Sequence, residues 1–232
     1  MRLTRPVVLA LLACVVTVGP AVTKTAPLSE PGVPGDGTME FAVYRKGDRI
    51  GTHRLTFQRE GQRLKVHVDV SLKVKVLFMT VYRYRHESTE VWSGDHLVSF
   101  ESETKQNGKQ WEVAAHAAAD DRLVVRTNDH RHVLPDTLFP TSYWNPQMMQ
   151  QSVWFNTQYG SALDVDVAPE GADRVEAMGH MVEAQRYKVT GVIPETGKPV
   201  NLDLWYGDNG ELVKLQFVAV ADGSVIDYER LS

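Results

Sequence analysis

One segment, from Leu64 to Phe78, alternates between apolar and mostly polar side chains at every position. A β-strand places successive side chains on opposite faces, so this pattern predicts one long strand with an apolar inner face. A helix would scatter the same apolar positions around its circumference. The even, apolar positions are Leu64, Val66, Val68, Val70, Leu72, Val74, Val76 and Phe78.

Turn signals divide the rest of the chain into similar short alternating segments. Asn107-Gly108 and Asp208-Asn209-Gly210 each separate two such segments, which is typical of β-hairpins. We therefore expect a mainly antiparallel all-β protein of about eleven or twelve strands. Twisted sheets of more than about ten strands curl or split, which favours a curved meander or an open half-barrel. The alternating segments from which these strands are expected begin at 39 and cover 50–57, 64–78, 80–92, 96–104, 111–117, 122–126, 163–167, 174–178, 182–190, 200–206, 212–220 and 225–231.

A single short helix is predicted after Asn145. Asn145 can cap the helix and Pro146 suits its first position. The apolar residues that follow, Met148 and Met149 among them, can then pack against the inner face of the sheet.

The first residues are typical of an export signal. Arg2 and Arg5 precede an apolar run from 6 to 18, which has the length of a signal-peptide core rather than of a membrane span. We expect a signal peptide at 1–21, a flexible linker at 22–37, rich in Pro and Gly, and a single β-rich domain at 38–232. The predicted location is the periplasm.

Cys14 leaves a second interpretation open. Leu11-Leu12-Ala13-Cys14 resembles a lipobox, in which Cys14 would be acylated and would anchor the protein to a membrane. Membrane contact is expected only in that case. Cys14 is the only cysteine, so cleavage after Ala21 would exclude disulfides, zinc–thiolate sites and a cysteine nucleophile.

Charge and motifs exclude several functions. The formal net charge is −4, and loss of Arg2 and Arg5 makes it more negative, so nucleic acid is not an expected partner. No standard nucleophile, metal or phosphate-binding motif is present. His130 and His132 form a His-x-His pair, but they lie in a predicted loop without a third ligand. No metal and no cofactor are predicted.

The even positions from 80 to 92 are the first candidate site. If they point inward, His86, Glu90 and Tyr84 bring an imidazole, a carboxylate and a phenol together, which suits acid–base chemistry or binding of a polar head group. The same residue types are also typical of a half-buried, hydrogen-bonded sheet face. The chemically distinctive members are Tyr82, Tyr84, His86, Ser88, Glu90 and Trp92.

Tyr143 and Trp144, at the predicted helix start, are the second candidate. They can cover a cavity, or they can simply anchor the helix to the sheet. Together the two candidates give one predicted ligand-binding set: Tyr82, Tyr84, His86, Trp92, Tyr143 and Trp144.

Several segments resemble a family of exported Gram-negative proteins known only as a domain of unknown function. The resemblance covers nearly all of 39–232 and implies no activity. More distantly, the strand plan resembles the half-barrel of lipoprotein-localisation carriers, which implies a curved sheet around a cavity for acyl chains. The same half-barrel also hosts a small-molecule enzyme. The segments that carry the family resemblance are YRYRHE at 82–87, EVW at 90–92, PTSYWN at 140–145, LWY at 204–206, GELVKL at 210–215 and DGSVIDY at 222–228.

Three functions follow as hypotheses. The leading one is a periplasmic binding or carrier protein for a hydrophobic ligand, either a lipid or an acyl chain. The second is an enzyme that uses His86, Glu90 and a tyrosine. The third is a structural or assembly protein whose sheet edges bind an envelope protein. They differ in where the even positions from 80 to 92 point and in whether a cavity lies beneath them.

Overall fold

The computed structural model describes residues 30–76 and 79–232, which form one antiparallel sheet of 14 strands. The strand order is β8-β7-β6-β5-β4-β3-β2-β1-β14-β13-β12-β11-β10-β9. Two meanders therefore meet where the first strand pairs with the last, and the sheet stays open at β8 and β9. This confirms the predicted all-β, open half-barrel class, although the sheet has 14 strands and not the eleven or twelve expected.

The N-terminal half of the sheet is formed by the first eight strands. Their bounds are β1 (Thr38–Arg45), β2 (Asp48–Glu60), β3 (Arg63–Val76), β4 (Met79–Ser93), β5 (His96–Gln106), β6 (Lys109–Ala118), β7 (Arg122–Thr127) and β8 (Arg131–Pro135).

The C-terminal half follows a connecting segment that contains the 3₁₀ helix η1 (Pro146–Gln150). Its strands are β9 (Val153–Phe155), β10 (Ala162–Ala177), β11 (His180–Ile193), β12 (Lys198–Gly207), β13 (Leu212–Val218) and β14 (Val225–Arg230).

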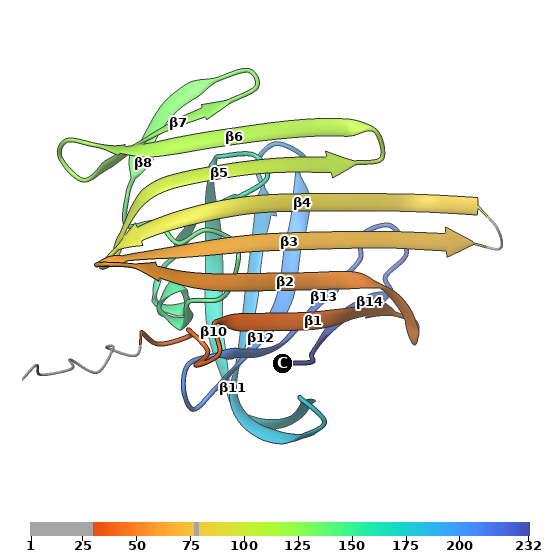
Figure 1. Cartoon of the computed structure of the whole chain (residues 1–232). Coiled ribbons are helices and arrows are strands. Elements are labelled where there is room, and N and C mark those ends of the chain that lie inside the picture. Colours follow the sequence, from red (N-terminus) through yellow and green to blue (C-terminus); the bar gives the residue numbers. More distant parts are fainter. Residues whose placement is uncertain (1–29, 77–78) are drawn as a thin grey trace, which may run out of the picture.

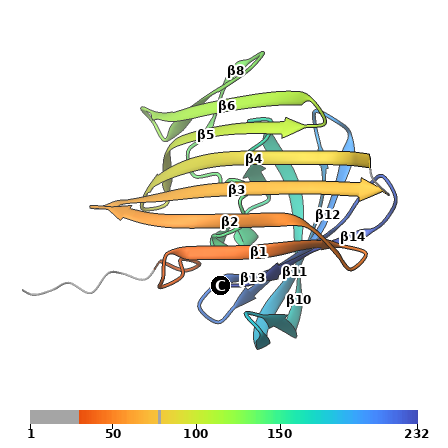
Figure 2. The same ribbon diagram turned by 45° about the vertical axis from the view of Figure 1, so that its right-hand side comes forward.

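The two halves cross each other. In Figures 1 and 2 the strands β10 to β12 run across the direction of β1 to β6 and lie behind them. Their inner faces share one core, in which Val66 and Phe100 from the first half join Leu204 and Leu215 from the second. The curved sheet thus supplies both walls of its own interior.

The alternation in β3 has the predicted consequence. Its even positions from Leu64 to Val74 are all buried, whereas the odd positions are exposed or half-buried. Residues 77 and 78, at the end of the predicted strand, lie outside the described residues. The burial pattern confirms the face assignment that period two indicated.

Two local predictions need correction. The segments 163–167 and 174–178 form one strand, β10, because a bulge between Pro169 and Gly171 bends the chain without ending it. Arg131 and His132 belong to the edge strand β8, not to a loop, because β7 offers them a partner. Pairing of this kind depends on distant chain segments, which local pattern does not reveal.

The predicted helix is present as a short 3₁₀ turn. The Asn145 side chain accepts a hydrogen bond from the Gln147 backbone N–H at 3.0 Å, and Pro146 opens the helix. Met148 and Met149 are buried in the core, as expected. No helix in the described part of the chain is long and apolar enough to cross a membrane.

The predicted signal peptide, Cys14 and residues 22–29 lie outside the described residues. Residues 30–37, the last part of the predicted linker, lie against the domain. The Gly32 N–H donates to the Asn209 carbonyl oxygen at 3.3 Å, and Val33 packs against the core. A Cβ at Gly32 would lie 2.3 Å from the Trp144 carbonyl oxygen, so only glycine fits this contact.

Candidate ligand-binding cavity

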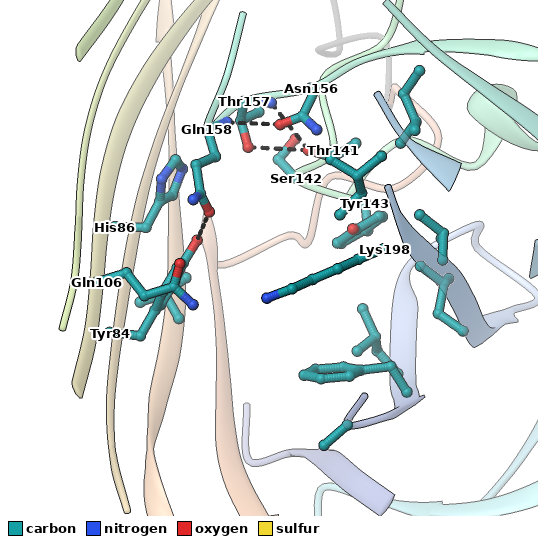
Figure 3. Close-up of a pocket in the computed structure, with 18 of the residues that line it drawn as sticks. Tyr84, His86, Gln106, Thr141, Ser142, Tyr143, Asn156, Thr157, Gln158 and Lys198 are labelled. Atoms are coloured by element: carbon teal, nitrogen blue, oxygen red, sulfur yellow. Dashed lines mark hydrogen bonds between the residues drawn. The ribbon is translucent and has the colours of Figure 1, made fainter. Parts of the chain in front are cut away.

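A cavity of about 350 Å³ lies between the two halves of the sheet and beneath residues 141–159 (Figure 3). The N-terminal half contributes His53, Val68, Val70, Leu72, Tyr82, Tyr84, His86 and Gln106. The connecting segment contributes residues 141–143, strand β9 contributes Trp154, and the turn between β9 and β10 contributes residues 156–159. The C-terminal half contributes Leu163, Ile193, Thr196, residues 198–202, Leu215, residues 217–220 and Tyr228.

The inner face of β4 forms part of the wall. Tyr82, Tyr84 and His86 line the cavity because alternate positions of a strand share a face. Their rings stack in a row, with centroids 6.5 Å apart for Tyr82 and Tyr84 and 6.4 Å apart for Tyr84 and His86. The predicted face therefore points inward at this end of the strand.

Two histidines lie in one row across neighbouring strands. Val70 of β3 pairs with His53 of β2 on one side and with His86 of β4 on the other. His86 is hydrogen-bonded through Nδ1 to Thr104 Oγ1 at 2.7 Å. The buried His53 Nε2 has no hydrogen-bond partner among the described residues. His53 is not among the predicted site residues, although it shares the inner face of its strand with Leu55.

Both imidazoles are neutral at pH 7. Burial lowers the pKa of His86 to about 4, against a smaller opposing effect of the Glu87 carboxylate. Burial, with a smaller contribution from His86, lowers the pKa of His53 to about 3. A neutral imidazole offers one donor and one acceptor. This part of the cavity can therefore hydrogen-bond an uncharged polar group.

The tyrosines also remain uncharged. Burial raises the pKa of Tyr143 to about 12 and that of Tyr84 well above its usual range. The Tyr84 hydroxyl lies 3.4 Å from Gln158 Oε1, and Gln106 Nε2 donates to the Tyr82 hydroxyl at 3.0 Å. These groups are neutral donors and acceptors in a wall that is mainly apolar.

Lys198 is the only lysine, arginine, aspartate or glutamate among the described residues that line the cavity. It is exposed at the start of β12. Figure 3 shows its side chain extending across the cavity toward Tyr84 and Gln106. A single cation thus lies where the cavity opens to solvent.

Tyr143 lines the cavity in a constrained conformation. Its φ of 64° lies in the left-handed region, which is uncommon for a bulky residue and is maintained only by surrounding contacts. One such contact is the Tyr206 hydroxyl, which donates to the Tyr143 carbonyl oxygen at 2.8 Å. That Tyr143 covers a ligand in this cavity stays a prediction.

Glu90, Trp92 and Trp144, also predicted site residues, do not line the cavity. Glu90 is fully buried, and its Oε2 accepts hydrogen bonds from Trp92 Nε1 at 2.8 Å and from Trp144 Nε1 at 3.0 Å. Burial raises the pKa of Glu90, and the hydrogen bonds offset part of this effect. Of the catalytic candidates, only His86 and Tyr84 face the cavity. Glu90 lies farther along β4, where the core covers the strand.

A separate cluster of possible metal ligands lies outside the cavity lining. Donor atoms of His96, Asp121 and Asp136 lie within 4.8 Å of one another. His96 Nδ1 contacts Asp136 Oδ1 at 3.0 Å, and this hydrogen bond raises the pKa of His96. A histidine–aspartate ion pair accounts for the cluster. His132, of the predicted His-x-His pair, is hydrogen-bonded through Nε2 to the Gly160 carbonyl oxygen at 2.8 Å.

A protein-family model matches most of the chain. Residues 41–231 match the model of the domain of unknown function DUF6134. The chain belongs to this family. No curated protein matches the sequence.

A solved structure has a similar fold. It is a β-barrel-like protein of the domain of unknown function DUF1849 from Brucella abortus, with a TM-score of 0.57 and 9% identity. The match covers 83% of this chain and 94% of that chain. At this identity the likeness concerns the fold alone, which is β-barrel-like. The resemblance to lipoprotein-localisation carriers stays a prediction from the strand pattern.

Proposed function

We propose that this protein binds or carries a hydrophobic ligand, a lipid or an acyl chain, in the cavity between the two halves of the sheet. The observation that carries the proposal is the cavity itself, about 350 Å³ with a largely apolar wall. Ligand sites in proteins are typically clefts of about 300–1,000 Å³ lined mainly by hydrophobic and aromatic side chains, with a few polar groups.

The apolar wall comes from both halves of the sheet. Val68, Val70 and Leu72 of β3 face Leu202, Leu215 and Phe217 of the C-terminal half across the interior. An apolar chain placed between them would lose contact with water on both sides, and burial of each CH₂ group contributes about 0.8 kcal/mol. This arrangement supports a ligand that is apolar along most of its length.

The polar groups support a ligand with an uncharged hydrogen-bonding group inside and a polar or anionic group outside. His53 and His86 are neutral, and His53 Nε2 is unpartnered within the described structure. A buried polar atom without a partner is costly, so a ligand hydroxyl or carbonyl at this position would stabilise the site. Lys198 at the opening suits an acidic head group.

The cavity favours this proposal over the alternatives. An enzyme built on His86, Glu90 and Tyr84 requires the carboxylate beside the imidazole, but Glu90 is bonded to two tryptophans outside the cavity. An assembly protein that binds only through its sheet edges requires no internal cavity. The predicted signal peptide at 1–21 supports export, and we place the carrier in the periplasm.

The test is native mass spectrometry and lipid extraction of protein purified from its own cell envelope. A matched pair of variants locates the ligand. Val200→Trp fills the cavity, whereas Val192→Trp adds the same side chain to an exposed position of the neighbouring strand β11.

We expect lipid to co-purify with the unmodified protein and with Val192→Trp, and its yield to fall to background in Val200→Trp. Thermal unfolding of both variants checks that they fold. Equal lipid yield from the two folded variants, or no lipid from any of the three proteins, would contradict the proposal.

A further inference from the structure

The cavity opens at one identifiable end of the molecule. Among its lining residues, Thr196, Lys198, Pro199, Val218 and Val220 are exposed, and they lie around the β11–β12 turn and the end of β13. On the opposite wall, Tyr82 and Gln106 lie near the ends of β4 and β5. The opening therefore faces the same direction as the β3–β4 hairpin, which projects beyond β2 and β5 in Figure 1.

That hairpin and its neighbour carry unpaired basic residues. Lys73, Lys75, Arg83 and Lys109 are all exposed, and within the described residues none of them forms an ion pair. Lys73 and Arg83 lie directly opposite each other on β3 and β4. Like charges in this arrangement destabilise a sheet. The chain as a whole has a net charge of −4, so the local excess of cations does not follow from composition.

Two basic residues farther from the hairpin end, by contrast, have acidic partners. Arg85 of β4 lies opposite Lys105 of β5. Arg85 pairs with Glu87 and Lys105 pairs with Glu103. Arg63, Arg126 and Arg131 are likewise exposed without an ion pair among the described residues. The four cations beside the cavity opening therefore differ from these in their position next to the opening and in the apolar side chains around them.

Exposed apolar side chains accompany the cations. Met79 and Val81 at the start of β4 are 70% and 52% exposed, and Val218 and Val220 across the opening are 42% and 58% exposed. Surfaces that combine basic and apolar side chains bind at the interface of anionic bilayers, where cations meet lipid head groups and apolar groups enter the acyl boundary.

We propose that this end of the molecule docks onto an anionic lipid bilayer and turns the cavity opening toward the membrane. The docking face consists of Lys73, Lys75, Met79, Val81, Arg83 and Lys109. Its charges also suit a nucleic acid or an acidic protein, but neither explains exposed apolar residues beside a lipid-sized opening. The proposal rests on surface charge and exposure, and it holds whether or not the cavity binds lipid.

The experiment is vesicle co-sedimentation with exported protein that carries Cys14→Ala, so that no acyl anchor contributes. Vesicles consist of phosphatidylcholine alone or of an equal mixture of phosphatidylcholine and phosphatidylglycerol. We expect binding to the mixed vesicles only, and we expect salt to weaken it, because screening weakens interactions between exposed charges.

Two sets of substitutions test the docking face. Each basic residue near an anionic surface contributes about fivefold to partitioning, so joint replacement of Lys73, Lys75, Arg83 and Lys109 by Gln is expected to reduce binding by at least about 100-fold. Replacing Met79 and Val81 by Ser is expected to reduce it by about tenfold without changing the salt dependence. A matched control replaces four basic residues elsewhere, at the opposite end of β3 and on β7 and β8: Arg63, Lys65, Arg126 and Arg131.

The proposal would be overturned if the docking-face variants bound the mixed vesicles as strongly as the control variant does. Equal binding of the unmodified protein to neutral and anionic vesicles would also overturn it. So would binding to double-stranded DNA or polyglutamate but not to vesicles. Lipid extraction from the docking-face variants separates this proposal from that of a lipid-filled cavity. Variants that retain co-purified lipid but no longer bind vesicles support the docking face, because the two readouts then depend on different residues.

Discussion

The two ends of the inner face of β4 belong to one strand and one alternating pattern, yet they have different environments. Tyr82, Tyr84 and His86 line the cavity, whereas Glu90 and Trp92 lie in the packed core. Period two determines which way a side chain points, but not what lies in front of it. The difference therefore comes from the chain that covers each end.

The covering segments account for this difference. Phe139 and Trp144 pack on Trp92, with ring centroids at 5.3 Å and 6.0 Å. The indoles of Trp92 and Trp144 both donate to Glu90 Oε2, whereas Glu90 Oε1 has no hydrogen-bond partner among the described residues. At the cavity end the imidazoles are neutral, and His53 Nε2 has no hydrogen-bond partner within the described part of the chain. Each end thus retains an unpartnered buried atom, but only that of His53 belongs to a residue that lines the cavity and could meet a ligand.

The largest expected effect is that of Glu90→Leu. Leucine removes the acceptor of two buried indole N–H groups, and each buried unsatisfied group costs about 1–3 kcal/mol. We expect a loss of about 2–6 kcal/mol in the free energy of unfolding, measured by urea denaturation at pH 7. Glu90→Gln keeps a carbonyl oxygen in place and is expected to lose much less. Equal losses in the two variants would mean that the tryptophan contacts do not stabilise this end.

The next effect is a pH dependence that arises at the cavity end. The pKa values of His53 and His86 are lowered to about 3 and about 4, from an ordinary value of 6.5. Between the folded and ordinary values the unfolded chain binds protons that the folded chain does not, so stability falls as the pH drops below 6.5. At pH 5 the loss is on the order of 2 kcal/mol per histidine. His86→Gln should flatten the curve, whereas replacement of the exposed His180 should not.

Glu90, at the core end of β4, gives a pH dependence of stability with the opposite sign. The raised pKa of Glu90 means that the unfolded chain releases its proton first as the pH rises above the ordinary glutamate value of 4.5. This contribution to stability is present at low pH and is lost between that value and the folded pKa. Comparison of Glu90→Gln with the unmodified protein across this window isolates it. A difference that grows toward low pH in favour of Glu90→Gln would contradict this sign.

The smallest expected effect on stability is that of Tyr84→Phe. The hydroxyl makes one long contact, 3.4 Å to Gln158 Oε1, so its removal should change the free energy of unfolding by less than about 0.5 kcal/mol. The amount of co-purified lipid should nevertheless fall, because the hydroxyl lies on the cavity wall. A stability loss above 1–2 kcal/mol would place Tyr84 with the structural end of β4.

The sequence by itself determined most of the strands, their faces and the capped turn at Asn145, because alternation, turn chemistry and capping act over a few residues. The direction of Tyr82, Tyr84 and His86 could be predicted for this reason. Other features depend on segments far apart in the chain. The pairing of β1 with β14 joins the two meanders, and the register of β2, β3 and β4 brings His53 into the row of His86. Only the tertiary structure decided that Trp144 covers Glu90 and leaves His86 beside a cavity, since burial depends on which distant segment packs on a face, and no local pattern records it.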